Sequence, residues 1–225
     1  LADTDKITAK KLAQRFNAKL RVTSDGTFAT LTLPDGTNVK DVVNDKENED
    51  VLEIISLDYR AVSYAVENEN QYEVNRPNYT INDSYYYQQT YLDYLNLGNV
   101  WNFSKGKNTT IAIIDTGIDT DHPEFVGKIS EKSYNATEDK VVKDYLLEDG
   151  NYDWSLVEDV QGHGTSVAGV IGASMNNEIG ITGIAPDANI IVIKAECDEK
   201  GSFNNTSDLI FGIYYAIEMD VDIVN

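Results

Sequence analysis

Beyond residue 82, continuous apolar runs of strand length alternate with segments of helical pattern. The runs are TTIAII, ANIIVIKA and VDIVN, and the segments between them are TSVAGVIGA and TSDLIFGIYYAIEM. Continuous apolar runs are typical of strands covered on both faces, and their alternation with helices predicts parallel pairing through right-handed crossovers. We therefore expect residues 83–225 to form an α/β domain, a parallel sheet with helices on both faces, in which Thr206 or Ser207 caps the second helix.

The first part of the chain shows a different pattern. Ile7, Leu12 and Phe16 fall near helical spacing, and residues 27–36 alternate before a Pro-Asp-Gly turn, which is typical of a half-buried strand. AVSYAVEN is a further strand candidate, and the polar residues that follow it carry no periodicity. These patterns predict a small α+β unit over residues 1–69 and a linker over residues 70–82, ahead of the α/β domain over residues 83–225.

Charge follows the same division. The formal net charge is −20, of which residues 1–82 carry −4 (10 Lys/Arg, 14 Asp/Glu) and residues 83–225 carry −16 (8 and 24). Such acidity argues against a nucleic-acid partner, and it is compatible with peptide or cationic substrates, with calcium, or simply with solubility. The single cysteine, Cys197, excludes an intrachain disulfide and argues against a zinc site. No apolar run approaches the roughly 18 residues of a membrane span.

Two stretches carry candidate chemistry. Asp115 directly follows the apolar run 111–114, so a parallel sheet would place it at the carboxyl end of a strand, where open α/β folds bind their ligands. His163 stands between two glycines, at the start of a helix of small side chains that can be buried on all sides. An aspartate that accepts one ring N–H fixes the imidazole tautomer and leaves a general base. Taken alone, each residue could equally be a cap or a turn residue, as His122 is in DTDHPEF.

These stretches resemble the subtilisin-like serine proteases. IAIIDTGIDTDHPEF is similar to the aspartate motif of that family, GHGTSVAGVIGA to its histidine motif, and the resemblance extends from about residue 82 to residue 225. It implies a subtilisin-like fold and a serine endopeptidase in which Asp115 and His163 belong to an Asp-His-Ser triad, in the chain order known for the family. The 48-residue spacing is longer than in minimal members, and we interpret the acidic residues 130–159 as a surface insertion.

The resemblance also suggests a role for residues 1–69. Family members carry a propeptide that assists folding and blocks the active site until it is cut, and AVSYAVENEN resembles the end of one. It implies a self-processed zymogen inhibited by its own propeptide, with a cut within residues 67–82. The first candidates for the processing site are Glu67, Glu69 and Asn70, whereas Arg76 is a poor one because Pro77 follows it. An unrelated N-terminal domain is the alternative.

No Gly-Thr-Ser-x-Ala context, in which the family places its nucleophile, follows His163. Ser166 lies three residues from His163, within the first helical turn, and is better explained as a helix-start residue. By the resemblance, the sequence stops inside the strand that lines the specificity pocket. We therefore expect the serine and the remaining C-terminal part of the catalytic domain to lie beyond residue 225, and residues 1–225 alone to be inactive. The alternative is a subtilisin-like binding or scaffold protein without a nucleophile.

Further site residues follow from the resemblance. Family members often hold calcium in the loop after the histidine helix, where Asn177 matches a ligand position and Glu124 stands where an aspartate is usual; an ordinary Asn-rich turn is the alternative. By the resemblance, residues 197–204 form an edge segment with which a peptide or protein substrate would pair by β-addition. The acidic residues near this segment could favour basic substrates or simply be solvated. The implied substrate-binding residues are Glu196, Gly201, Ser202, Phe203 and Asn225.

Two other interpretations of Asp115 fit less well. A phosphoryl-transfer nucleophile would need Asp-x-Asp after the strand, but Gly117 occupies the second acidic position. A bare metal-binding loop of Asp115, Asp119, Asp121 and Glu124 lacks the glycine and the terminal glutamate spacing of an EF-hand. The Asn-, Tyr- and Lys-rich composition is similar to that of proteases of Gram-positive bacteria, some of which cut lantibiotic leader peptides. We therefore expect a secreted or cell-surface bacterial protein.

Overall fold

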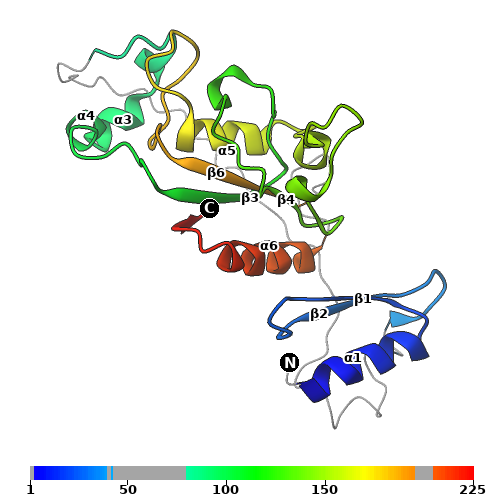
Figure 1. The fold of residues 1–225 in the computed structure, drawn as a ribbon. Helices are drawn as coiled ribbons and strands as arrows, with labels where there is room; N and C mark the ends of the chain where they lie inside the picture. Colours follow the sequence, from blue (N-terminus) through cyan, green and yellow to red (C-terminus); the bar gives the residue numbers. More distant parts are fainter. Residues whose placement is uncertain (1–2, 40–41, 43–79, 196–204) are drawn as a thin grey trace. The chain divides into compact units, whose positions relative to one another are not determined.

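The computed structural model describes residues 3–39, 42, 80–195 and 205–225 (Figure 1). The chain divides into two compact units, unit 1 over Leu1–Tyr59 and unit 2 over Arg60–Asn225. In unit 1, the helix α1 (Asp3–Arg15) precedes an antiparallel hairpin of β1 (Lys19–Val22) and β2 (Ala29–Thr32). The helix and β2 correspond to the predicted elements, whereas β1 was missed because two of its four residues are cationic. The strand candidate AVSYAVEN lies outside the described residues.

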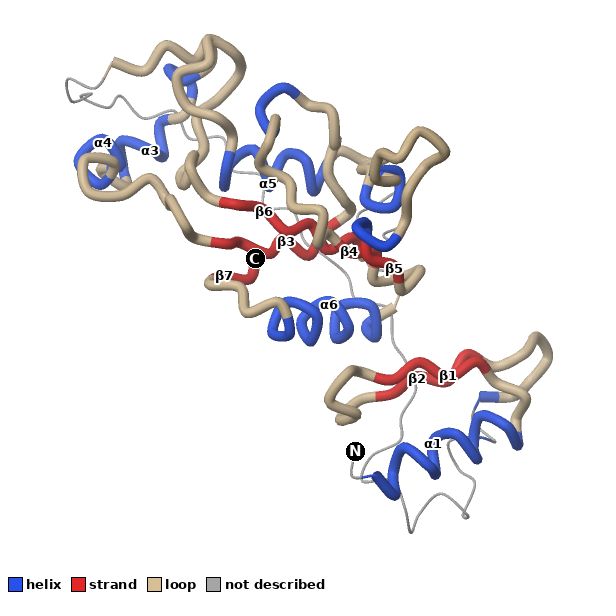
Figure 2. The backbone as a smooth tube through the Cα atoms, in the orientation of Figure 1, coloured by secondary structure: helices blue, strands red, loops and turns tan. Residues whose placement is uncertain are grey.

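A five-stranded sheet forms the centre of unit 2. Its order is β5-β4-β6-β3-β7, and every neighbouring pair is parallel except β4 with β5 (Figure 2). The prediction of an α/β fold around a parallel sheet is therefore confirmed, with one antiparallel edge. The strands are β3 (Thr110–Asp115), β4 (Tyr134–Asn135), β5 (Lys140–Val141), β6 (Asn189–Lys194) and β7 (Ile223–Val224).

Two helices cover opposite faces of this sheet, α5 (His163–Gly172) and α6 (Thr206–Glu218) (Figure 1). Side chains alternate along each strand, so Ile111 and Ile113 join one core cluster while Ala112 joins the other. This double covering explains the continuous apolar runs. Two expectations were wrong: Asn205 rather than Thr206 or Ser207 is the N-cap of α6, and α5 is not buried on all sides, because Val170 is exposed.

A third cluster packs at the start of unit 2. Leu92, Leu97 and Trp101 form it, and the indole N–H of Trp101 donates to the carbonyl of Ile184 at 2.9 Å. This contact joins the first helices of unit 2 to the loop that follows α5. Those helices are η2 (Tyr86–Gln88), α3 (Thr90–Tyr94) and α4 (Leu97–Val100), of which the first is a 3₁₀ helix.

The acidic residues 130–159 are only partly the surface insertion that we expected. Their middle is exposed, but the segment also supplies β4, β5 and the 3₁₀ helices η4 (Val142–Asp144) and η5 (Trp154–Val157). Val142 and Val157 are fully buried, and the hydroxyl of Ser133 accepts a bond from the N–H of Val192 in β6 at 3.0 Å. The expectation failed at the ends because strands of two residues leave no readable alternation.

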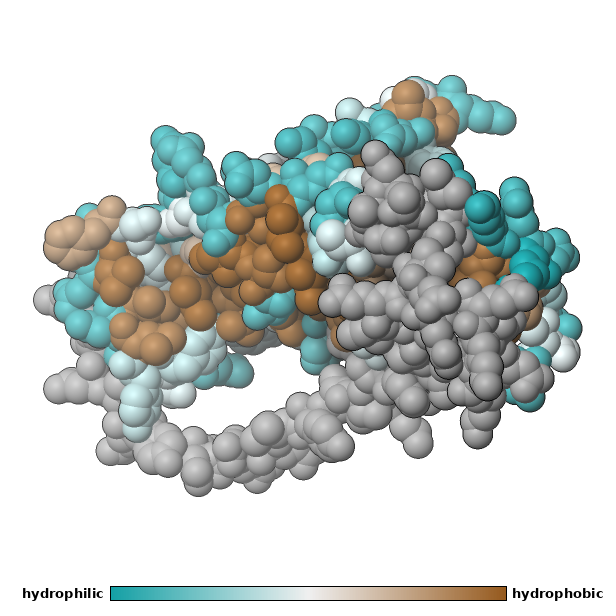
Figure 3. Space-filling model, turned by 90° about the horizontal axis from the view of Figure 1, so that it is seen from below, coloured by the Kyte–Doolittle hydropathy of each residue, from teal (hydrophilic) through white to brown (hydrophobic). Residues whose placement is uncertain are grey.

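Unit 2 exposes large apolar side chains in α6 and β7, and Figure 3 shows hydrophobic residues, in brown, gathered in one view of the surface. The exposed large apolar residues of these two elements are Ile213, Ile217, Ile223 and Val224. Among the helices in the described part of the chain, none combines the length and apolar character that a membrane span requires.

Candidate active site

Asp115 and His163 meet at the carboxyl end of β3. The Nδ1 atom of His163 lies 2.7 Å from Oδ1 of Asp115, which also accepts the backbone N–H of Thr116 at 2.8 Å. The aspartate is 8% exposed, while the histidine side chain is 56% exposed. In a neutral imidazole that donates Nδ1–H to Asp115, Nε2 carries the free lone pair. The pair thus has a buried acceptor and an accessible nitrogen that can take a proton.

Glycines allow the two segments to approach this closely. Gly117 has φ +118°, and a Cβ on it would lie 2.5 Å from the carbonyl oxygen of Val157. A Cβ on Gly164, in the first turn of α5, would collide with the carbonyl oxygen of Gly117. Gly162 precedes the helix with φ 90°. The glycines that flank His163 therefore serve both the tight turn into α5 and the close approach to the end of β3.

Asp159 joins the same two segments. Its Oδ1 accepts the hydroxyl of Thr116 at 2.8 Å and the N–H groups of Gln161 and Gly162 at 3.0 and 2.9 Å. Its Oδ2 accepts the N–H and the hydroxyl of Thr165 at 2.9 and 2.7 Å. Burial by itself would raise the pKa of Asp159, but the hydrogen bonds from Thr165, Gly162 and Gln161 together lower it to about 2. The carboxylate is therefore ionised at neutral pH.

Glu124 and Asn177 lie together, as the resemblance implied, and Asp83 joins them at the loop after α5. Glu124, in the 3₁₀ helix η3 (Pro123–Phe125), is 2% exposed and accepts the amide of Asn177 at 2.8 Å and the N–H of Ile181 at 3.1 Å. Asp83 accepts the N–H groups of residues 176 and 177 at 3.1 and 2.9 Å. Two buried carboxylates thus converge on one loop.

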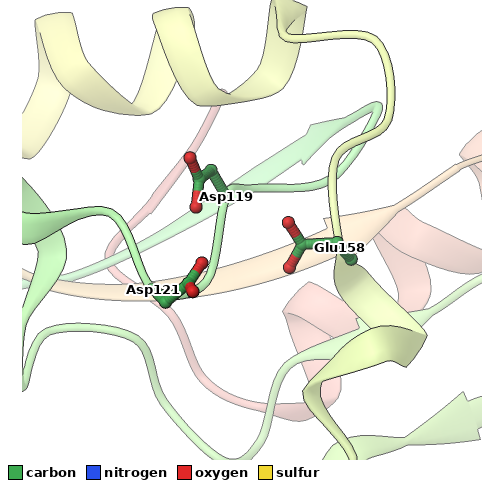
Figure 4. A group of neighbouring side chains, drawn as sticks. All are labelled: Asp119, Asp121 and Glu158. Atoms are coloured by element: carbon green, nitrogen blue, oxygen red, sulfur yellow. The ribbon is translucent and has the colours of Figure 1, made fainter.

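A second acidic group lies between the turn after β3 and the residues that precede α5. Asp119 and Asp121 follow β3, Glu158 precedes α5, and their carboxylates turn toward one another (Figure 4). One oxygen of each lies within 4.8 Å of the others, so the group could hold a metal ion. Burial, a hydrogen bond shared with Asp121 and the negative charges of Asp121 and Glu158 raise the pKa of Asp119.

Comparison with known proteins matches residues 106–225, more than half of the chain, to the subtilase family. The chain belongs to the subtilase family. It is 32% identical over 225 residues to the thermophilic serine proteinase of Bacillus sp. (strain AK1), covering 94% of this chain and 49% of that protein. It is 40% identical over 126 residues to the intracellular serine protease of Paenibacillus polymyxa, covering 56% of this chain and 34% of that protein.

Among solved structures, this subtilase is similar to fervidolysin from Fervidobacterium pennivorans, with a TM-score of 0.64 and 21% sequence identity. The likeness covers 99% of this chain and 34% of that chain, and it shows that the fold is shared. The chain spans about half or less of the length of these relatives. Relatives named as intracellular and as extracellular proteases both occur, so family membership alone does not decide location.

Of the remaining predicted site residues of the subtilase, Asn225 is described and the others lie outside the described residues. Asn225 runs beside the end of β3, where its N–H donates to Ala112 at 2.8 Å and its carbonyl accepts from Ile114 at 2.9 Å. The hydroxyl of Ser166 donates to the carbonyl of Gly162 at 2.8 Å, as expected of a helix-start residue. The predicted residues outside the described part of the chain are Glu67, Glu69, Asn70, Glu196, Gly201, Ser202 and Phe203.

Sequence reasoning missed three polar residues that organise these sites. Asp159 stands four residues before the histidine, where an acidic residue ahead of a helix start is a capping signal that could have revealed it. Thr116 carried no such signal, because its role depends on a contact across 43 residues. Asp83 was equally hidden, since it lies in a polar stretch without periodicity and contacts residues more than 90 positions away.

Proposed function

We propose that this chain contributes the aspartate and the histidine of a subtilisin-type serine endopeptidase whose nucleophilic serine lies outside residues 1–225. One observation carries the proposal: Nδ1 of His163 lies 2.7 Å from Asp115 in a member of the subtilase family. The buried carboxylate and the exposed ring have the arrangement that a general base needs.

In the proposed reaction, Nε2 of His163 takes the proton of the serine hydroxyl as the serine oxygen attacks the carbonyl carbon of the scissile bond. Asp115 accepts Nδ1–H, keeps the ring in place and stabilises the imidazolium. His163 then gives the proton to the leaving amine, and a second cycle with water releases the acyl group. The free energy of the charged intermediate is lowered by the 2.7 Å contact with Asp115.

A fluorophosphonate probe, which labels activated serines, tests this function in the full-length protein. The wild type should be labelled, and His163→Ala should react at least about 100-fold more slowly, because the general base is lost. His122→Asn is the matched control, since it changes the other histidine and should be labelled like the wild type. A folded wild type that is not labelled after removal of residues 1–69 would instead support the scaffold protein without a nucleophile.

We also propose that residues 1–69 are a self-cleaved, inhibitory propeptide. The compact unit 1 supports this, as does the similarity to the Bacillus sp. proteinase over 94% of the chain. Intact-mass measurement and N-terminal sequencing of the full-length wild type should find a cut within residues 67–82 that His163→Ala lacks. A cut that persists in His163→Ala would show processing by another protease, and an uncut wild type would contradict self-processing.

We propose a structural calcium ion at the loop after α5. Asp83, Glu124 and Asn177 would hold it, because carboxylate and amide oxygens suit calcium and Oδ1 of Asp83, both oxygens of Glu124 and Oδ1 of Asn177 each accept a single described hydrogen bond. The ion would supply positive charge to two buried carboxylates. Calcium at about 100 times its Kd should raise the Tm by roughly 5–10 °C.

Chelation followed by readdition of calcium tests the ion. Glu124→Gln should lose most of the calcium-dependent rise in Tm. Glu178→Gln, at an exposed position of the same loop, should keep it. A wild-type Tm that does not respond to calcium would contradict this part of the proposal.

The substrate side of the proposal is a peptide or protein chain, bound by Glu196, Gly201, Ser202 and Phe203 at an edge segment and by Asn225 at the entry to the strand that lines the specificity pocket. We propose that the protease acts outside the cell or at its surface, which fractionation of the native host would test. Action on lantibiotic leader peptides stays a prediction from composition.

A further inference from the structure

Asp159 connects the elements that carry the proposed catalytic pair. On one side it binds the hydroxyl of Thr116, the residue directly after Asp115. On the other side it binds Gly162 and Thr165, which flank His163 in the first turn of α5. It therefore ties together the neighbours of both members of the pair, although the pair itself comes from positions 48 residues apart.

Thr116 completes the connection. Its hydroxyl donates to Asp159 at 2.8 Å and accepts the N–H of Gly164 at 2.9 Å, while its own N–H donates to Oδ1 of Asp115 at 2.8 Å. One residue thus orients the aspartate through its backbone and contacts the histidine helix through its side chain. The bonds form a closed ring from Asp115 through Thr116 and Asp159 to the helix that holds His163.

We propose that Asp159 is a positioning residue, which sets the separation and angle of Asp115 and His163 by holding the turn after β3 against the first turn of α5. The inference rests on the proposed function for its kinetic consequence. Its structural part concerns only the geometry of the pair.

The position requires a carboxylate. Five donors point at the two oxygens of Asp159, namely three N–H groups and two hydroxyls. An asparagine would turn its NH₂ group toward either the Thr165 donors or the Gln161, Gly162 and Thr116 donors. Either orientation sets donors against donors, so the turn and the helix would separate. A displacement of about 1 Å at a reacting group can cost about 100-fold in rate.

Kinetics of the full-length protein test the proposal. Asp159→Asn should lower kcat by roughly 10- to 100-fold with KM changed by less than about threefold, because geometry rather than substrate binding is lost. Thr116→Val should have a similar effect, and Thr116→Ser, which keeps the hydroxyl, should recover most of that loss. Asp153→Asn is the matched control: this aspartate also caps a helix, accepting the N–H of Ser155 at 3.2 Å at η5, and kcat should stay within twofold of the wild type.

A spectroscopic measurement separates positioning from general stability. The low-field Nδ1–H proton resonance of His163 can be assigned in the full-length protein as the one that is lost in His163→Ala. It should weaken or move upfield in Asp159→Asn and Thr116→Val, and persist in Thr116→Ser and Asp153→Asn. If Asp159→Asn does not fold, the Thr116→Val and Thr116→Ser pair carries the same test.

The proposal is overturned if folded Asp159→Asn keeps its kcat within twofold of the wild type and its low-field resonance unchanged. It is also overturned if Asp153→Asn lowers kcat as much as Asp159→Asn does. Failure of the proposed function is a distinct result: the wild type would then neither cleave peptides nor react with fluorophosphonate. In that case the resonances of the same variants still decide whether Asp159 positions the pair.

Discussion

Asp159 and Asp119 both contact Thr165, but the pKa values of their carboxyl groups shift in opposite directions. The hydroxyl of Thr165 donates to Asp159 at 2.7 Å and accepts the backbone N–H of Asp119 at 2.9 Å. Burial by itself would raise the pKa of both carboxyl groups. The net shift nevertheless lowers the pKa of Asp159 to about 2, whereas it raises that of Asp119. The difference lies in their partners, because Asp159 faces five donors and Asp119 faces the carboxylates of Asp121 and Glu158.

This comparison shows how a chain of strong negative charge can build a precise site. The N–H groups of Gln161, Gly162 and Thr165, together with two threonine hydroxyls, all donate to one carboxylate, that of Asp159. The group of Asp119, Asp121 and Glu158, by contrast, brings three carboxylates together. Asp159 therefore stabilises the fold, whereas the three clustered carboxylates cost free energy unless a cation compensates their charge.

The largest effect on stability should come from filling the space between the first turn of α5 and the turn after β3. Gly164→Ala would place a Cβ against the carbonyl of Gly117 and 3.1 Å from the hydroxyl of Thr116, which donates to Asp159. We expect a loss of about 3 kcal/mol in the free energy of unfolding, because backbone must move. Urea denaturation of Gly164→Ala and of the wild type measures this loss.

Gly169→Ala in the same helix is the control. Its new Cβ would meet only the flexible end of Ile181 at 3.3 Å, and alanine favours a helix over glycine by about 1 kcal/mol. Its stability should therefore stay within about 1 kcal/mol of the wild type. Equal losses in the two variants would contradict a specific close approach at Gly164.

A smaller effect should follow from the charge of Asp159. Since its folded pKa of about 2 lies below its ordinary value of 3.8, its contribution is fully present above the ordinary value and disappears as pH falls toward 2. Asp159→Asn should cost about 1 kcal/mol at pH 6, the usual value of a helix cap, and the difference should vanish near pH 2. Urea denaturation across this range measures it, and a difference independent of pH would contradict the role of the charge.

The smallest effect on stability should come from Asp119. The raised pKa of Asp119 means that its carboxylate destabilises the metal-free fold at neutral pH, and that the cost disappears as pH falls through that pKa toward 3.8. Asp119→Asn should therefore stabilise the chelated protein by about 0.5 kcal/mol at low salt. Asp149→Asn removes a carboxylate whose hydrogen bonds with Asn151 lower its pKa, and it should bring no gain. A loss of stability in Asp119→Asn would contradict the account.

How much could be foreseen depends on the range of the interaction. The sheet, its two covering helices and the partnership of Asp115 with His163 follow from apolar runs and motifs that are local in the chain. The strand β4 (Tyr134–Asn135) was missed because two residues leave no period, although Tyr134 is buried. Asp83 and Thr116 act through contacts between distant segments, and no local pattern marks such residues.

The central claim is that Asp115 and His163 act together as the base of a serine endopeptidase. The kcat of the full-length protein on a chromogenic peptide, measured for Asp115→Asn, tests it most directly. Asp222→Asn is the control, since Asp222 accepts the N–H of Thr110 at 2.8 Å at the other end of the same strand. We expect a fall of about 10⁴-fold for Asp115→Asn, because the imidazole loses its tautomer, and less than threefold for Asp222→Asn. A fall of less than tenfold for Asp115→Asn would contradict the assignment.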